Sequence, residues 1–190
     1  TPLFDALAGF HRAHPGIGIS LLEDASDQLF ERLRCGAADL CLVGYADGDP
    51  PAGLGTHPIV RERLVAAVPD SHPLCAAGRV TLDDVRRHPV VCLPEGTGIR
   101  AVFDRACTAA GSIRQSPSSS GPRAVLDLAA RGMGVAILSE SMLEGRGLHP
   151  LLIDDVHDLD VLGLAWRHTP PGPAVRELLR HARAAFGGPA

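Results

Sequence analysis

Apolar residues recur along the chain with two periods, one typical of helices and the other of strands. In residues 3–10, leucine and phenylalanine repeat at helical spacing, and the sequence HPG at 14–16 ends the segment. The next segment, IGISLLE (17–23), alternates apolar and polar positions as a strand does. The pattern therefore predicts a helix followed by a strand.

The alternation of helices and strands continues to the end of the chain. Ser26 is placed to cap a second helix and Gly36 to end it, and Thr81 with Asp84 begins a short helix. Pro122 suits the first turn of a later helix. The remaining predicted strands are 39–43, 59–68, 89–93, 134–138, 148–153 and 161–166, and the longer helices are 99–110, 122–131 and 175–186. Apolar strands alternating with helices are typical of a parallel α/β sheet.

Two distant stretches, 31–45 and 126–141, share one order of features: a helix, a glycine breaker, an apolar strand and a small polar end. This echo suggests two similar α/β lobes. In open parallel sheets, ligands bind beyond the carboxyl ends of the strands. The sequence thus predicts that Gly44, Tyr45 and Ser139 lie where each sheet meets a ligand cleft. The alternative is that they belong to ordinary loops that end strands.

Composition narrows the classes of function. With 45% hydrophobic and 21% charged residues, the 190-residue chain has the balance of a soluble globular protein. It contains no lysine, which excludes a Schiff-base lysine and a P-loop. A net charge of −4, with no basic run longer than Arg86-Arg87, argues against nucleic-acid binding by this segment. No apolar run is long enough for a membrane helix. Because the first methionine is Met133, we expect a piece of a longer chain.

The five cysteines form an odd set without a CxxC pair. Several lie in apolar runs, which favours reduced, buried side chains and a reducing cytoplasm. A redox switch between Cys92 and Cys107 is the alternative.

The sequence shows no metal-binding or catalytic motif. His11 and His14 are three residues apart on one predicted helix, but no HExxH motif or Cys/His cluster accompanies them, so we expect solvent-facing side chains and no metal. No GxSxG motif is present, and no spacing of Ser, His and Asp implies a triad. We therefore expect no enzyme and no cofactor.

A glycine motif of the form GxGxxA runs from Gly96 to Ala101, between a strand and a helix. As a dinucleotide fingerprint it is weak, because no acidic residue lies near position 120 to hold a ribose. A second interpretation is that the backbone N–H groups at this helix start, including Gly98, bind a carboxylate together with the Thr97 hydroxyl. Arg100 adds positive charge there, unless it is a solvated helix residue.

Hydroxyl groups precede two other helix starts, at Ser26 and at Ser118–Ser120. Each serine alone is best interpreted as a helix cap. Taken together, the three helix starts favour a hydrogen-bonding cleft.

The longer motifs in order along the chain are ERLRCGAADLCLVG (31–44), VPDSHPL (68–74), LPEGTGIR (93–100) and ARGMGVAIL (130–138). In this order the chain resembles the effector-binding domain of LysR-type transcriptional regulators. The similarity extends from about residue 4 to about residue 186.

The resemblance implies an α/β fold of two Rossmann-like lobes with a hinge of two crossing strands, the type 2 periplasmic-binding-protein fold. Lobe I is expected at 1–68 and 156–190, and lobe II at 69–155. The family binds a small effector between its lobes and signals to an N-terminal winged helix-turn-helix domain. We expect that domain to lie outside this chain, so that DNA is bound only through it. The family also implies a homodimer. The lack of a long apolar run predicts that no membrane is a partner.

Carried over by position, the expected effector-binding residues are Ser26, Tyr45, Thr97, Gly98 and either Ser119 or Ser120. The sequence pattern itself adds Arg100 and Ser139 to this expected set. Two features depart from the family pattern. Its first strand and the polar loop after it precede Thr1, and Ser139 stands where many members have proline.

The sequence thus predicts a cytoplasmic ligand-sensing domain for a small polar or anionic metabolite. Two other functions on the same scaffold stay open. A solute-binding protein of a transporter requires an export signal or a lipid-anchor cysteine upstream of Thr1. An enzyme requires titratable groups that converge in the cleft, where only Glu95 and Arg100 flank the proposed site.

Overall fold

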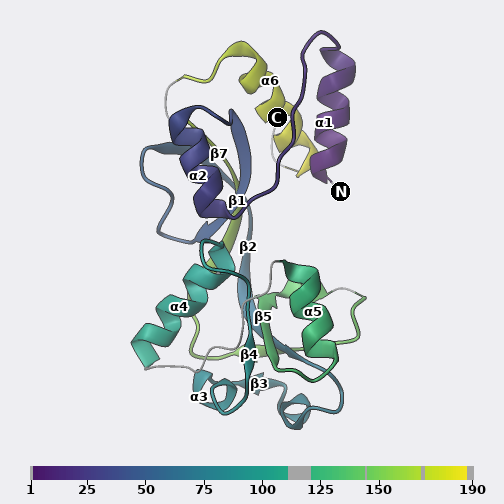
Figure 1. Cartoon of the computed structure of the whole chain (residues 1–190), viewed down its shortest axis with the longest axis vertical. Helices are drawn as coiled ribbons and strands as arrows, with labels where there is room; N and C mark the ends of the chain where they lie inside the picture. The colour runs from purple at the N-terminus through teal and green to yellow at the C-terminus, as the bar shows by residue number, and fades with distance from the viewer. Residues whose placement is uncertain (1, 111–120, 144, 168–169, 188–190) are drawn as a thin grey trace. The chain divides into compact units, whose positions relative to one another are not determined.

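The structure is a computed structural model, and it describes residues 2–110, 121–143, 145–167 and 170–187 (Figure 1). The chain divides into two compact units. Unit 1 contains residues 1–43, 50–60 and 162–190, and unit 2 contains residues 44–49 and 61–161. The lobe boundaries expected from the family stay predictions.

The helices of the described residues agree closely with the helical periodicity. They are α1 (Pro2–Ala13), α2 (Ser26–Cys35), α3 (Leu82–Val85), α4 (Gly98–Ala110), α5 (Pro122–Ala130) and α6 (Pro173–Ala185), with short 3-10 helices η1 (Pro73–Ala77) and η2 (Glu140–Leu143). Gly36 ends α2 in the left-handed conformation at φ 79°, as predicted. Thr81 and Asp84 form a capping box at α3, also as predicted.

Ser26 does not cap α2 as the sequence suggested. The N-cap is Ala25, whose carbonyl accepts the Leu29 N–H at 3.0 Å, and Ser26 is the first helical residue. The Ala25 N–H is held instead by the Asp24 carboxylate at 3.0 Å, which fixes the entry into the helix one residue earlier than expected.

The strands form a mixed sheet rather than a parallel one. They are β1 (Leu40–Ala46), β2 (Leu54–Val68), β3 (Arg79–Val80), β4 (Val90–Val91), β5 (Val135–Ser139), β6 (His149–Ile153) and β7 (Leu159–Arg167). Their order is β1-β7-β2-β5-β4, and β6 pairs with β2 and β3. β2 is antiparallel to both β5 and β6, whereas β4 is parallel to β5 and β3 to β6. The prediction of a parallel sheet was wrong because apolar periodicity shows which segments form strands but not the direction in which they pair.

The predicted strand at 17–23 is also wrong. These residues take no helix or strand conformation, and Ile19, Leu21 and Leu22 are exposed. Alternating apolar residues favour a strand only where a neighbour offers backbone hydrogen bonds and a packing surface. Within the described part of the chain this segment belongs to no ladder.

Each unit has its own apolar core. In unit 2, α4 and α5 pack against the fully buried strand β5, and the end of β2 from Leu64 to Val68 is buried in the same core. In unit 1, α1 packs along α6 over a smaller core that includes Leu164 and Leu179 (Figure 1). The strands β1, β2 and β7 have residues in both units.

Candidate functional site

The first turn of α4 lies directly against the end of β1, within unit 2. A side-chain carbon at Gly98 would lie 2.5 Å from the carbonyl carbon of Gly44, from the Tyr45 nitrogen and from Asp160 Oδ1. Glycine permits this approach without strain, because any added side-chain carbon would meet main-chain atoms at a distance that forces the backbone to shift. The second glycine of the GxGxxA motif therefore serves packing between a helix and a strand in this chain.

Asp160 is the polar residue next to which Gly44, Gly98 and Ser139 lie. It stands on β7 and is 8% exposed, and its Oδ2 accepts a hydrogen bond from the Ser139 hydroxyl at 3.1 Å. Its other carboxylate oxygen, Oδ1, is buried and has no hydrogen-bond partner among the described residues. Burial raises the pKa of Asp160 to about 6, against the Ser139 hydrogen bond, which lowers it, and the Glu62 charge adds to the rise.

The end of β1 is held in place by ion pairs on the surface of unit 2. From α4, Arg105 contacts Asp49 at 2.9 Å and Asp158 at 3.3 Å. The Asp47 N–H donates to the Leu159 carbonyl at 2.9 Å. These contacts join the ends of β1 and β7 to α4, and so they position Gly98 and Asp160 relative to each other.

Arg100 is not a solvated helix residue, contrary to one of the two sequence interpretations. It is 6% exposed, and its Nε lies 2.8 Å from both carboxylate oxygens of Asp104. Its Nη1 donates to the Leu93 carbonyl at 3.4 Å, and its Nη2 lies 3.6 Å from Glu95. The charge of Arg100 is therefore committed to neighbours in the same helix and in the preceding turn.

Thr97 precedes α4 and is half-buried. Its hydroxyl donates to the Pro94 carbonyl at 2.8 Å, and its own carbonyl accepts the Ala101 N–H at 3.0 Å. An anion at this helix start would meet backbone N–H groups first, and it would gain the Thr97 hydroxyl proton only when the bond to Pro94 opens.

The other predicted residues are placed differently. Tyr45 follows Gly44 on β1, so the pleat directs its side chain to the opposite face, where its buried hydroxyl has no hydrogen-bond partner among the described residues. Ser26 is buried and belongs to unit 1. Ser119 and Ser120 lie outside the described residues. The structure thus brings Gly44, Gly98 and Ser139 together, and the effector-binding role of all eight residues stays a prediction.

Asp160 was missed by the sequence reasoning. The only signal was an acidic residue beside an apolar run, in LDVLGLAW (159–166). Such a residue is normally placed at a solvated strand end. Its burial depends on Ser139 and Gly98, which lie far away in the sequence.

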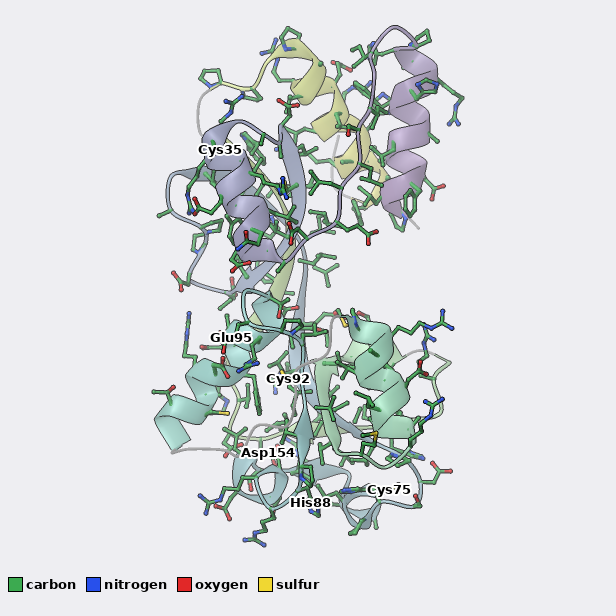
Figure 2. All side chains as sticks on the ribbon, viewed as in Figure 1. Cys35, Cys75, His88, Cys92, Glu95 and Asp154 are labelled. Carbon is green, nitrogen blue, oxygen red and sulfur yellow. The ribbon has the colours of Figure 1, made fainter. Side chains whose placement is uncertain are left out.

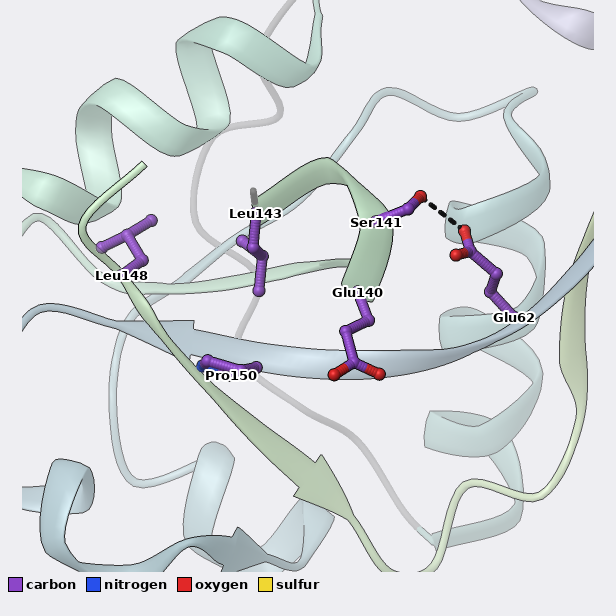
Figure 3. Close-up of a pocket in the computed structure, with 6 residues that line it drawn as sticks. All are labelled: Glu62, Glu140, Ser141, Leu143, Leu148 and Pro150. Atoms are coloured by element: carbon purple, nitrogen blue, oxygen red, sulfur yellow. Dashed lines mark hydrogen bonds between the residues drawn. The ribbon is translucent and has the colours of Figure 1, made fainter. Parts of the chain in front are cut away.

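A hollow of about 440 Å³ lies elsewhere in unit 2 and is lined by Glu62, Glu140, Ser141, Leu143, Leu148 and Pro150. The Ser141 hydroxyl donates to the Glu62 carboxylate at 2.7 Å (Figure 3). Two carboxylates at this hollow disfavour an anion. Glu62 also contributes to the raised pKa of Asp160, so its charge acts on both this hollow and the candidate site.

A second hollow, of about 330 Å³, lies in unit 1 beside α6. Its arginines have neighbours already: Arg176 donates to the Pro171 carbonyl at 2.7 Å, Arg180 pairs with Glu177 at 2.9 Å, and Arg183 lies 6.0 Å from the ring centre of Trp166. These contacts pair Arg176 and Arg180 within unit 1, whereas the Nε of Arg183 is buried and has no hydrogen-bond partner among the described residues.

The cysteines are free thiols. Burial raises the pKa of Cys41 to about 11, of Cys92 to about 12 and of Cys107 to about 11, so these three are not reactive thiolates at neutral pH. Cys35 is exposed on α2, whereas Cys92 follows β4 in the core of unit 2 (Figure 2). This environment gives no support to a switch between Cys92 and Cys107.

The family model described as "LysR substrate binding domain" matches residues 1–187. The chain belongs to this family. Its fold is accordingly the type 2 periplasmic-binding-protein fold, which confirms both the resemblance and the fold class predicted from the sequence.

Known relatives agree with this assignment. An uncharacterized HTH-type transcriptional regulator of Bacillus subtilis, YybE, is 26% identical over 85% of this chain and 56% of its own length. The regulatory domain of Synechocystis PCC6803 CcmR in complex with 2-PG has a TM-score of 0.79 at 22% identity, covering 96% of this chain and 89% of that one. The effector-binding domain of QuiR in complex with shikimate has a TM-score of 0.77 at 19% identity, covering 95% and 88%.

The LysR-type domain spans about half the length of the curated relatives it matches. Several of those relatives are named HTH-type transcriptional regulators. Among its described residues, no helix combines the length and the apolar character needed to cross a membrane.

Proposed function

We propose that this LysR-type domain senses a small polar or anionic metabolite for a transcriptional regulator and performs no catalysis. The observation that carries the proposal is the half-satisfied Asp160 carboxylate beside the amide-rich start of α4. A buried carboxylate oxygen without a partner is costly, so a ligand or water that donates a hydrogen bond to it gains binding free energy.

The ligand class follows from the groups at this position. Backbone N–H groups at the start of α4 suit a carboxylate or another anion. Asp160 suits a hydroxyl or another hydrogen-bond donor on the same ligand. The solved structures of CcmR with 2-PG and of QuiR with shikimate support a small-molecule effector, because they share this fold.

The regulatory mechanism we propose is a shift in population between two arrangements of the domain. A ligand that prefers one arrangement changes the affinity of a coupled DNA-binding segment, typically by about 1–3 kcal/mol. The names of the curated relatives and the share of their length that the chain covers support such a segment in the whole protein. Homodimer formation and a cytoplasmic location belong to the same proposal.

The test is a thermal-shift screen of small carboxylates and hydroxylated acids, followed by calorimetry on each compound that binds. We expect the substitution Thr97→Ala to weaken binding about fivefold to tenfold, the size of one hydrogen bond. Asp160→Asn replaces an acceptor by a donor, and so we expect it to weaken hydroxylated ligands more than simple carboxylates.

A matched control is Thr108→Ala on the same α4. The Thr108 hydroxyl donates to the Asp104 carbonyl within the helix at 2.8 Å, and this side chain is exposed. Ser26→Ala tests separately whether unit 1 contributes. If all three site variants bind every hit as the parent chain does, the site assignment is wrong. If no compound binds at all, the ligand-sensing proposal itself fails.

A further inference from the structure

Three metal-ligating side chains from the two ends of the sequence meet in unit 1. His14 follows α1, and Glu177 and His181 stand one turn apart on α6. One ligand atom from each lies within 4.8 Å of the other two, and His14 Nε2 is 4.0 Å from Glu177 Oε2. All three are half-buried. No sequence motif indicated this cluster, because His14 is far from the other two residues along the chain.

The two imidazoles are positioned by α1. The Phe10 ring is 2% exposed, and its centre lies 5.0 Å from that of His14 and 6.0 Å from that of His181. A side-chain carbon at Gly9 would lie 3.1 Å from His181 Nδ1. Glycine inside a helix costs about 1 kcal/mol relative to alanine. Here it leaves room for the His181 ring to lie against the α1 backbone.

This packing sets which nitrogen of His181 faces the cluster. Because Nδ1 is turned toward Gly9, Nε2 is the nitrogen on the side of Glu177 and Arg180. The Arg180 guanidinium lies 3.2 Å from His181 Nε2 and 2.9 Å from Glu177 Oε2. Arg180 thus occupies the position between the Glu177 carboxylate and the His181 ring.

We propose that His14, Glu177 and His181 bind one divalent transition-metal ion, with Zn²⁺ as the preferred ion. Two imidazoles and one carboxylate are ligands that Zn²⁺ accepts at about 2.0–2.2 Å, and they leave a fourth position for water. Tetrahedral ligands at that distance lie roughly 3.4 Å apart. The His14 ring, about one-third exposed, can make the needed approach by a change of side-chain torsion. The ion displaces the Arg180 guanidinium and joins α1 to α6.

A second cluster provides a contrast within the same chain. Asp70, Cys75 and His149 of unit 2 also bring ligand atoms within 4.8 Å of one another. There Asp70 and His149 are exposed and already pair with each other, with side chains that are 83% and 52% exposed. The thiol of Cys75 gives this second cluster a distinct spectroscopic signature, because a Co²⁺–thiolate bond produces a charge-transfer band.

The experiment is a titration of the chelator-treated chain with Zn²⁺ by calorimetry and with Co²⁺ by visible absorption. We expect one ion per chain and Co²⁺ bands without thiolate charge transfer. His14→Ala and His181→Ala should each weaken binding at least about tenfold, within the range seen when a metal site loses a supporting group. His149→Ala is the matched control and should leave the affinity unchanged.

Arg180→Ala separates a metal site from a purely structural ion-pair cluster. Removing the competing guanidinium should tighten Zn²⁺ binding roughly tenfold, whereas a structural role predicts only a loss of thermal stability. With Zn²⁺ at a hundred times its Kd, we expect the melting temperature of the parent chain to rise by ~5–10 °C, and the His181→Ala variant to show no rise. Thiolate charge transfer, loss of binding in His149→Ala, or no saturable binding would each overturn the proposal.

Discussion

Arg100 and Asp160 are two buried charged residues near Gly98, and they differ in how completely their polar atoms are hydrogen-bonded. Arg100 contacts the Asp104 carboxylate twice at 2.8 Å and also a backbone carbonyl. Asp160 has one oxygen bonded to Ser139 and the other without a partner among the described residues. Both side chains are less than one-tenth exposed.

The difference separates a structural charge from a charge that is left for binding. A buried ion pair keeps its contacts, because breaking the pair leaves an uncompensated buried charge and strongly destabilises the folded protein. A buried carboxylate with one unpaired oxygen is instead costly to keep ionised. Burial therefore raises the pKa of Asp160 to about 6, and the group favours a proton or a hydrogen-bond donor. Of these two charged residues, Asp160 is therefore the functional candidate, because one of its carboxylate oxygens has no partner among the described residues.

The largest effect is expected for Arg100→Leu. It removes both contacts to Asp104, whose side chain is 38% exposed. Since Asp104 regains some water, we expect a loss of about 3 kcal/mol in the free energy of unfolding, at the low end for a broken buried pair. Denaturant unfolding followed by circular dichroism measures it.

The control for this variant is Arg105→Leu, in the same helix. Arg105 pairs with Asp49 and Asp158, but its side chain is 45% exposed, and exposed pairs contribute about 0–1 kcal/mol. Equal losses for the two variants would mean that burial does not distinguish Arg100, and the contrast with Asp160 would fail.

The next effect is a pH dependence that Asp160→Asn should remove. The folded chain holds this proton up to about pH 6, whereas the unfolded chain releases it near the ordinary value of 3.8. Stability contributed by this group is therefore lost as pH rises from about 4 to about 6. Between pH 4 and pH 7, we expect the Asp160→Asn variant to gain about 2 kcal/mol relative to the parent chain. A constant offset between the two unfolding curves would show that Asp160 is ionised throughout.

Much of the fold could be predicted because its signals are local. The capping box of Thr81 with Asp84 and the left-handed Gly36 depend only on neighbouring residues, and both were found in the sequence. Strand pairing is not local. The pattern at 17–23 predicted a strand where no ladder forms, and it could not show that β2 pairs antiparallel with β5 and β6.

The candidate site was predictable only in part, for the same reason. The sequence indicates Gly44 and Ser139 because they end apolar strands, and Gly98 because it starts a helix. The structure brings all three to Asp160. That carboxylate carried no local signal, since its burial arises from contacts with residues that are 21 to 116 positions earlier in the chain.

A smaller loss is expected for Gly98→Ala, which tests whether the two polar residues depend on the close approach of α4 to β1. The added carbon meets main-chain atoms at 2.5 Å, so α4 must shift, at a cost of about 1.5 kcal/mol. Gly18→Ala is the control, because nothing lies within 4 Å of the new carbon, and it should be neutral or slightly stabilising. Thermal unfolding compares the stability of the two variants. A Gly98→Ala variant as stable as Gly18→Ala would rule out the tight contact.

The smallest effect is expected for Ser139→Ala. This variant tests directly whether the Ser139 hydrogen bond depends on the charge of Asp160. The variant removes the hydroxyl that donates to Asp160, so the carboxylate loses its one partner among the described residues. Above pH 6 we expect a loss of about 1 kcal/mol, and below pH 4 less, because the Ser139 bond favours the ionised form. In the Asp160→Asn background, the same substitution should have a smaller effect at high pH. A double-mutant cycle at pH 8 and pH 4 measures this coupling, and a coupling of equal size at both values would mean that Ser139 holds the side chain in place without responding to its charge.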